Sequence, residues 1–297
     1  MSIIVDKISY TYEIGTGFER QALKEVSCVI EKGEFIGLIG HTGSGKSTFI
    51  QHLNGLVKAT SGAIYYDGED IYDKDFDMRK LRSKVGLVFQ YPEHQLFETD
   101  IFKDVCFGPK NLGLDRAETE LRAFEALRLV GLDESLYYQS PFDLSGGQKR
   151  RVAIAGVLAM KPEVLILDEP TAGLDPKERI AIRNYIAELS RNKIILFATH
   201  VVSDIECIAD YVLLLKKGEI IAMGTPVELI EKMHGKVAEI TCTLDEVGKL
   251  QEKYHIGNIR QRKNGIALRL VGDELPDEAV MVDENIDLED VYLYYFE

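Results

Sequence analysis

The sequence lacks the features that mark membrane-embedded and secreted proteins. No apolar run among its 297 residues approaches the roughly 18 residues that span a bilayer. Residues 1–7 lack the basic-then-apolar layout of a signal peptide. Its four cysteines are scattered with no Cys-x-x-Cys pair, which disfavours both a disulfide framework and a zinc site. We therefore expect a cytoplasmic protein whose reduced cysteines pack in the core.

Positive charge is also in short supply. The chain holds 35 lysines and arginines against 49 aspartates and glutamates, a formal net charge of −14. A protein that binds the phosphate backbone of nucleic acids needs a basic face, so general nucleic-acid binding is not expected. The composition, 45% hydrophobic and 28% charged, is that of a globular chain with one large core or two domains.

A glycine-rich stretch, GHTGSGKST, occupies residues 40–48. It fits the G-x-x-x-x-G-K-S pattern of a phosphate-binding loop, between an apolar strand at 35–39 and a helical run at 48–53. Glycines let backbone N–H groups turn toward an anion, and the helix N-terminus favours phosphate. Lys46 would reach the β- and γ-phosphates, and Ser47 would offer a hydroxyl to Mg²⁺. The predicted nucleotide-binding residues are Gly40, His41, Thr42, Gly43, Ser44, Gly45, Lys46, Ser47 and Thr48.

Polar side chains follow two apolar runs that are typical of central parallel strands. Residues 164–167 are followed by Asp168 and Glu169, and residues 194–198 are followed by Thr199 and His200. Ligands of α/β sheets bind at the carboxyl ends of the strands. Asp168 suits Mg²⁺ binding, Glu169 suits the activation of a water, and His200 is placed to contact a γ-phosphate. The alternatives are two solvated carboxylates and a structural histidine.

Three other positions are candidates for the same site. Gln90 ends a buried strand at 85–90 and could equally be a solvated strand end. Residues 144–148, LSGGQ, open a helix whose N-terminus suits an anion, although an ordinary N-cap followed by a solvated basic face at 149–151 fits too. Tyr12 could stack on a base or simply pack.

The alternation of strands and helices predicts a mostly parallel α/β sheet. From residue 234 the texture changes, and we expect a small α+β unit at 235–297 that holds a hairpin around residues 264–265 and an apolar ending at 288–296. Two amphipathic helices are predicted at 116–130 and 177–190. Their expected buried residues are Leu121, Phe124, Leu127 and Val130 in the first, and Ile180, Ile182, Tyr185, Ile186 and Leu189 in the second.

The order of the motifs resembles that of the ATP-binding cassette (ABC) ATPases. GHTGSGKST, Gln90, LSGGQ, VLILDE, AGLD at 172–175 and His200 follow one another as in that family, and the resemblance covers residues 2 to about 230. It implies a P-loop fold with a mostly parallel core sheet, an antiparallel β subdomain and a helical subdomain at about 91–162. We therefore expect an ABC ATPase domain at 1–234 and an accessory domain at 235–297.

The resemblance also implies ATP and Mg²⁺ as cofactors and a dimer that sandwiches two ATP molecules. Tyr12 would stack on adenine, residues 40–48 would hold the phosphates, and Ser47, Gln90 and, through water, Asp168 would arrange Mg²⁺. The implied catalytic residues are Lys46, Gln90, Glu169, which would polarise the attacking water, and His200, which would contact the γ-phosphate.

Two further motifs would act across the dimer. Asp175 would communicate between the two sites. The residues that would cap the ATP bound by the other subunit are Ser145, Gly146, Gly147 and Gln148.

Within the family, residues 1 to about 175 resemble the ATPase of energy-coupling-factor (ECF) importers of the cobalt and vitamin type. The stretches that carry this resemblance are 88–97, 107–111 and 151–160. The remainder, including residues 199–206 and 288–296, resembles the ATPase of ABC-2 or multidrug exporters. These two resemblances predict a chain that recombines two subfamilies.

The resemblances imply the ATP-hydrolysing motor subunit of a transporter, an ECF-type importer of vitamins or metal ions. It would be peripheral on the cytoplasmic face of the cell membrane, bound to integral membrane subunits and to a second ABC ATPase, identical or a sister. The first alternative is an exporter motor. The second is a non-transport ABC ATPase that acts on nucleic acid, which the single cassette and the net charge disfavour.

Overall fold

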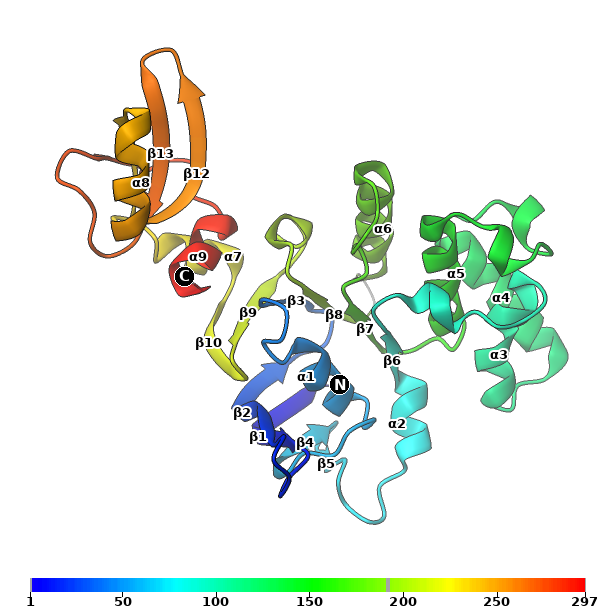
Figure 1. Cartoon of the computed structure of the whole chain (residues 1–297). Coiled ribbons are helices and arrows are strands. Elements are labelled where there is room, and N and C mark those ends of the chain that lie inside the picture. The colour runs from blue at the N-terminus through cyan, green and yellow to red at the C-terminus, as the bar shows by residue number, and fades with distance from the viewer. Residues whose placement is uncertain (1, 191–192, 297) are drawn as a thin grey trace.

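A mostly parallel sheet lies at the centre of the computed structural model, which describes residues 2–190 and 193–296 (Figure 1). Its strand order is β10-β9-β3-β8-β7-β6, and only the β9–β10 pair is antiparallel. Every residue of β3, β6, β7 and β8 is buried, because both faces of a central parallel sheet are covered. The strands are β3 (Phe35–Ile39), β6 (Val85–Val88), β7 (Val164–Asp168), β8 (Ile194–Thr199), β9 (Tyr211–Lys216) and β10 (Glu219–Gly224).

An antiparallel sheet packs beside this centre, with strand order β2-β1-β4-β5. Its strands are β1 (Ile3–Tyr12), β2 (Arg20–Ile30), β4 (Ser61–Tyr66) and β5 (Glu69–Asp70). Helix α1 (Lys46–Leu53) lies between the two sheets, and its Phe49 and Ile50 share one buried cluster with residues of both. The short helix α2 (Met78–Lys84) then leads into β6. Helix α1 is the next element after β3, and it packs between the two sheets.

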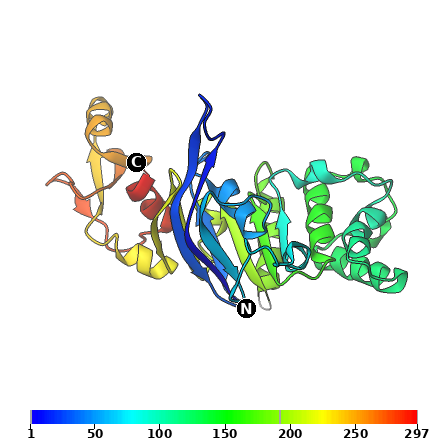
Figure 2. The ribbon, with the colours of Figure 1, turned by 90° about the horizontal axis from the view of Figure 1, so that it is seen from below.

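A helical region lies beyond β6 and β7, at the opposite end of the molecule from the C-terminal elements (Figures 1 and 2). Helix α4 buries Ala123, Ala126 and Leu127, whereas Leu121 is 51% and Phe124 37% exposed, so the expected buried face is only partly right. Small side chains let neighbouring helices approach closely, which moves the contact face toward the alanines. The helices of this region are α3 (Ile101–Asn111), α4 (Arg116–Leu129) and α5 (Gly146–Leu158), with the 3₁₀ turns η1 (Pro92–Gln95), η2 (Glu134–Leu136) and η3 (Pro141–Asp143).

Helix α6 (Pro176–Leu189) runs between β7 and β8 in the chain. Ile182 and Ile186 are buried as predicted, but Ile180 is 48% exposed. The buried stripe is therefore narrower than the sequence pattern, which fits a helix that contacts the core along one line. The 3₁₀ turn η5 (Val202–Asp204) follows β8.

The C-terminal elements form a separate sheet with strand order β12-β13-β11-β14. The expected apolar ending is a helix, α9, whose Leu288 and Val291 join the buried cluster of the central sheet. The boundary expected at residues 234–235 stays a prediction, and residues 1, 191, 192 and 297 lie outside the described residues. The elements are α7 (Pro226–Glu231), β11 (Val237–Cys242), α8 (Leu244–Lys253), β12 (His255–Arg262), β13 (Gly265–Val271), β14 (Val280–Met281) and α9 (Leu288–Phe296).

Two expectations about composition can be placed on this fold. Across residues 2–190 and 193–296 no helix has the length and apolarity needed to cross a bilayer. Cys28, Cys106 and Cys242 are free and buried, whereas Cys207 is free and exposed, so the expectation of packed cysteines fails at that one position.

Candidate functional site

The glycine-rich loop joins β3 to α1, and its shape depends on glycines at positions that disfavour other residues. Gly43 and Gly45 have φ angles of +80° and +108°. A Cβ at Gly40 would lie 2.5 Å from the carbonyl oxygen of Leu215, and one at Gly45 would lie 2.6 Å from that of Ala22. Left-handed backbone and close approach both favour glycine, so the loop can turn its N–H groups inward.

Lys46 is the first residue of α1, and its ammonium group lies over the loop. Its Nζ donates to the carbonyl oxygens of Gly40 at 2.7 Å and His41 at 3.4 Å, and it lies 3.2 Å from Oε1 of Glu169. The side chains of Lys46 and Glu169 are 5% and 7% exposed. A buried ion pair of this kind needs its remaining hydrogen-bonding capacity satisfied, and the two carbonyls do this for the lysine.

Glu169 connects this lysine to the neighbouring strand. It follows β7, and its backbone N–H donates to Ala198 of β8 at 2.8 Å. Oε2 accepts hydrogen bonds from Nδ1 of His200 at 2.7 Å and from the backbone N–H of His200 at 3.3 Å. The parallel pairing of β7 with β8 therefore places Lys46, Glu169 and His200 in one chain of contacts.

Asp168 is the last residue of β7 and lies behind this chain of contacts. Burial raises the pKa of its carboxyl group, against the opposing effects of a hydrogen bond with Ser47 and the charge of Lys46. Its Oδ1 is buried and has no hydrogen-bond partner among the described residues. Carboxylate and hydroxyl oxygens suit Mg²⁺, which takes few protein ligands. The orphaned oxygen and the Ser47 hydroxyl therefore fit that ion, and Gln90 lines the same cavity as Ser47.

A cavity of about 520 Å³ lies beside the glycine-rich loop, and Gly40, Ser44 and Asp168 are not among its lining residues. The predicted residues that line it are Tyr12, His41, Thr42, Gly43, Gly45, Lys46, Ser47, Thr48, Gln90, Glu169 and His200. Arg20, Lys24 and Lys217 line it too, although the sequence patterns did not single them out. Arg20 donates to the carbonyl oxygen of Gly43 at 3.4 Å. No local motif marks these bases, since they enter the site from β2 and the β9–β10 turn.

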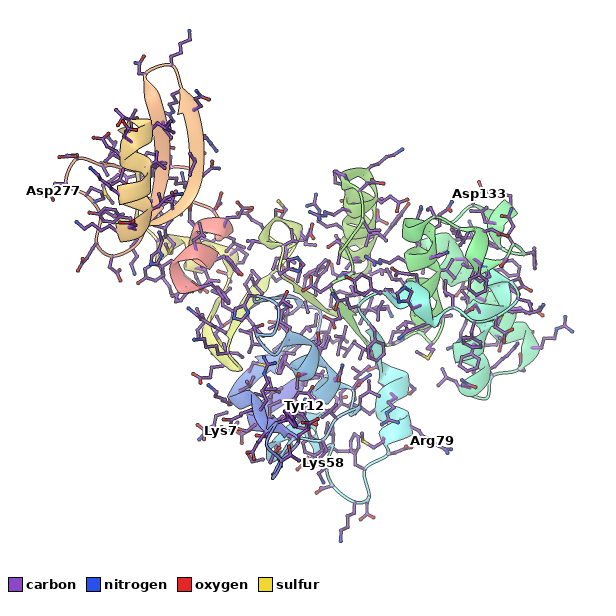
Figure 3. All side chains as sticks on the ribbon, in the orientation of Figure 1. Lys7, Tyr12, Lys58, Arg79, Asp133 and Asp277 are labelled. Atoms are coloured by element: carbon purple, nitrogen blue, oxygen red, sulfur yellow. The ribbon has the colours of Figure 1, made fainter. Side chains whose placement is uncertain are left out.

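Tyr12 lies where the N-terminal sheet meets α1 (Figure 3). Its hydroxyl group forms a 3.0 Å hydrogen bond with Oγ1 of Thr48, and its ring packs edge-on against Tyr10 at 4.8 Å. Tyr10 in turn packs edge-on against the buried His52. Tyr12 is still 39% exposed, so one part of it is braced and another faces the cavity. Packing and base stacking are both compatible with this placement.

The LSGGQ residues lie apart from this cavity. Ser145 is the N-cap of α5, and its hydroxyl accepts from the N–H of Gln148 at 3.2 Å while its N–H donates to Oε1 of Gln148 at 2.9 Å. A Cβ at Gly147 would meet Oε2 of Glu178 at 1.1 Å, so a larger residue there would displace the end of the Glu178 side chain. Asp175 likewise caps α6 through the N–H of Glu178. Neither motif lines the cavity of its own chain.

The basic residues after LSGGQ differ from one another. The solvated face that residues 149–151 could have formed is not what the structure shows, because Arg150 is only 2% exposed. It is paired with Glu93 of η1. Burial of an arginine requires such partners, and no sequence pattern indicated them.

The chain is similar in sequence to known proteins of one family. The family model described as "ABC transporter" matches residues 23–172. The Caldanaerobacter subterraneus "Energy-coupling factor transporter ATP-binding protein EcfA2" is 49% identical over 257 residues, covering 84% of this chain and 90% of that protein. The protein of the same name from Ligilactobacillus salivarius is 45% identical over 289 residues, covering 95% and 98%.

Solved structures give the same result. The structure of cbiO1 from Clostridium perfringens, described as part of the ABC transporter complex cbiONQ, has a TM-score of 0.68 and 38% identity, covering 84% of this chain and 98% of that one. A dimeric ATP-binding cassette in a post-hydrolysis state, bound to ADP and Pi, has a TM-score of 0.66 and 30% identity, covering 75% and 98%. The predicted fold class is confirmed by these likenesses.

The sequence-based prediction about the subfamily of the second segment is wrong. The similarity to the Ligilactobacillus salivarius protein covers 95% of the chain and therefore continues past residue 176, so the expected exporter-like second segment and the recombinant chain are not supported. The stretches behind that expectation are the end of β8 with η5 and the apolar helix α9. Val202 and Ile205 in the first stretch and Leu288 and Val291 in the second are buried in the core, and core packing carries little information about a subfamily.

ABC transporter ATP-binding proteins are ATPases coupled to transport, and the cavity joins the groups that such chemistry needs. The match to relatives is nearly full-length and the solved relatives share the fold. The chain therefore belongs to the ABC transporter ATP-binding proteins and, among them, to the energy-coupling factor transporter ATP-binding proteins.

Proposed function

We propose that the chain is the ATP-hydrolysing motor subunit of an energy-coupling-factor importer of vitamins or metal ions. The observation that carries this proposal is the chain of contacts from Lys46 through Glu169 to His200, at the edge of a cavity lined by the glycine-rich loop. Near-full-length similarity to the "Energy-coupling factor transporter ATP-binding protein EcfA2" supports the choice of an importer motor.

ATP would bind with its phosphates in the glycine-rich loop and its base against Tyr12. The backbone N–H groups of the loop and the start of α1 would favour the phosphate charges. Lys46 would exchange its contact with Glu169 for the β- and γ-phosphates. Tyr12 is held by Thr48 and Tyr10, so it can offer a fixed ring face to adenine at little cost in conformational freedom.

Ser47, Gln90 and Asp168 would hold Mg²⁺. Bound there, the ion would neutralise charge on the phosphate oxygens. The buried, unpartnered Oδ1 of Asp168 supports this assignment, since a buried carboxylate oxygen without a partner is costly. Asp168 would act through water, and Ser47 and Gln90 would contribute their oxygens from α1 and from the segment that follows β6.

Glu169 would orient and polarise the attacking water, and His200 would contact the γ-phosphate. The hydrogen bonds from the side chain and backbone of His200 fix the Glu169 carboxylate at the cavity wall. A general base must lie within hydrogen-bond reach of the proton it takes, and this carboxylate reaches the phosphate end of the cavity beside Lys46. The reaction would then rely on positioning and charge stabilisation.

Two such chains would form a dimer with ATP at the interface. Ser145, Gly146, Gly147 and Gln148 do not line the cavity of their own chain, which supports a role toward the nucleotide of another subunit. Asp175 would link the two sites. Both halves of a composite site are present in this sequence, so a second copy or a sister ATPase would complete it. A site that is complete only when closed can couple hydrolysis to movement.

The segment after Gln90 would meet an integral membrane subunit on the cytoplasmic face. Tyr91 is 46%, Phe97 56% and Phe107 45% exposed. The rings of Phe97 and Phe107 pack edge-on with centroids 4.9 Å apart. Exposed aromatic clusters are common at protein interfaces, which supports this segment as the coupling surface.

Affinity purification of the full chain from detergent-solubilised membranes tests the proposal. We expect a transmembrane coupling subunit and small substrate-binding membrane proteins to be recovered, and the latter would name the substrate. A second sample carries Phe97→Ala and Phe107→Ala in the proposed coupling surface. This variant should keep ATP hydrolysis but should no longer recover the membrane proteins. If the unmodified chain recovers no membrane protein, the proposal of an importer motor is contradicted. If the variant recovers the membrane proteins equally well, the proposed coupling surface is contradicted.

A further inference from the structure

Arg150 is a buried charge that the proposed mechanism does not use. It lies in α5, two residues after LSGGQ. Among the fully buried side chains of the described residues, it is the largest. Burying a guanidinium group is costly unless every donor is paired, so a buried arginine marks a place where several segments are fixed together.

The guanidinium group of Arg150 joins two loops that reach the site from different strands. Nη2 donates to Oε1 and Oε2 of Glu93 at 3.1 and 3.3 Å, and Nε lies 3.4 Å from Oε2. Nη1 donates to the carbonyl oxygens of Pro170 at 3.1 Å and Ala172 at 2.6 Å. Glu93 belongs to η1, just after Gln90, and the two carbonyls belong to the turn that directly follows Glu169.

That turn holds Glu169 in an unfavourable backbone conformation. Glu169 has a φ angle of +48°, and the N–H of Ala172 donates back to its carbonyl oxygen at 3.1 Å. A non-glycine residue in the left-handed region costs on the order of 1–3 kcal/mol and persists only where its surroundings hold it. Arg150 binds the carbonyl oxygens of Pro170 within this turn and of Ala172 at its end, and so it restrains the path of the chain that carries Glu169.

We propose that Arg150 is a positioning residue for Glu169 and that it ties the Glu169 turn to the segment after Gln90. This inference rests on the proposed function, because it gives Glu169 the role of activating water. If a membrane partner moved η1, the Arg150 side chain would transmit that movement to the Glu169 turn. The planar fork of arginine matches a carboxylate on one edge and two carbonyls on another, which a lysine cannot do.

The test compares Arg150→Lys and Glu93→Gln with the unmodified full chain. Arg150→Lys keeps the charge but loses the planar set of guanidinium donors. Glu93→Gln weakens the contact between residue 93 and the guanidinium group and leaves the two carbonyl contacts of Arg150 unchanged. The matched control is Arg122→Lys, because Arg122 pairs with Glu118 within α4 at 2.5 Å and touches no loop of the site. For each variant, kcat for ATP hydrolysis, the Kd for ATP and the melting temperature are measured.

A small displacement of a catalytic group costs up to about 100-fold in rate. We expect Arg150→Lys to lower kcat at least roughly tenfold, with the Kd for ATP within about twofold of the unmodified chain, because the glycine-rich loop is untouched. Glu93→Gln should lower kcat less, and Arg122→Lys should change neither quantity. A second readout separates positioning from folding: with Glu169→Gln in place, Arg150→Lys should leave ATP-dependent dimerisation unchanged.

An unchanged kcat for Arg150→Lys would overturn the inference, and so would a parallel loss of kcat, ATP affinity and melting temperature, which describes a purely structural role. If Arg150→Lys does not fold, Glu93→Gln decides: a lowered kcat at constant Kd supports the inference and an unchanged kcat overturns it. Absence of ATP hydrolysis by the unmodified chain, with or without its recovered membrane partners, would instead contradict the proposed function.

Discussion

Replacing Glu169 with glutamine separates nucleotide binding from hydrolysis. The glutamine keeps the size of the side chain but removes the charge of the carboxylate. In Glu169 that carboxylate lies 3.2 Å from Nζ of Lys46 and accepts a hydrogen bond from Nδ1 of His200 at 2.7 Å. At that distance the gross attraction to Lys46 is about 5 kcal/mol with an effective dielectric constant of about 20, most of which desolvation offsets. The phosphates of ATP compete with this carboxylate for the lysine. Relief of even ~1.4 kcal/mol of that competition would tighten ATP binding about tenfold.

The effect on turnover has the opposite direction. General base catalysis contributes roughly 10²–10⁴ in rate, so we expect kcat to fall about 10³-fold, or ~4 kcal/mol in the barrier. The assay measures phosphate release at saturating ATP, the Kd for ATP by equilibrium titration, and ATP-dependent dimerisation by size-exclusion chromatography. We expect slow hydrolysis, equal or tighter ATP binding and a trapped dimer. A kcat within a few-fold of the unmodified chain, or a loss of ATP affinity, would refute this account of Glu169.

Three further predictions follow from the site and its supports. Lys46→Ala should abolish measurable ATP binding at micromolar nucleotide, because a buried cation is lost from the phosphate loop, and a fluorescent ATP analogue tests this with Lys103→Ala as an exposed control outside the cavity. Asp168→Asn should raise the Mg²⁺ concentration needed for half-maximal hydrolysis at least roughly tenfold, and an unchanged Mg²⁺ titration would contradict its role. Burial lowers the pKa of His52 below its usual 6.5, against a weaker opposing hydrogen bond to Thr48. The folded state therefore resists a proton that the unfolded chain accepts, so the free energy of unfolding should fall as the pH drops through about 6.5 toward the lowered pKa, and urea titrations should show that His52→Gln removes this part of the slope.

The parts of the site that the sequence could predict are those whose neighbours are close in the chain or in the sheet. The glycine-rich loop is local, because its glycines, lysine and serine are consecutive. The contact between Glu169 and His200 was also within reach, because continuous apolar runs identify central strands and the carboxyl ends of adjacent parallel strands meet at one edge. Fold class followed from the same alternation of strands and helices.

The parts that the sequence could not predict come from elements with no motif of their own. Arg20 and Lys217 reach the cavity only because β2 and the β9–β10 turn fold over the loop. The burial of Arg150 depends on two distant loops that meet at its guanidinium group, and no pattern along α5 indicates this. The outward position of Leu121 in α4 has the same origin, since the tertiary partner of a helix decides which face is covered.

The contacts of Lys46 suggest how binding and chemistry depend on each other. Its three N–H groups are matched by the carbonyls of Gly40 and His41 and by the carboxylate of Glu169. A phosphate can gain a hydrogen bond from this lysine only by displacing one of these partners, and the charged carboxylate is the partner that a phosphate repels. The displaced carboxylate would keep its bonds to His200 and gain freedom to accept from a water on its Lys46 side. The same exchange would therefore seat the phosphates and prepare the base, which ties hydrolysis to correct binding of the nucleotide.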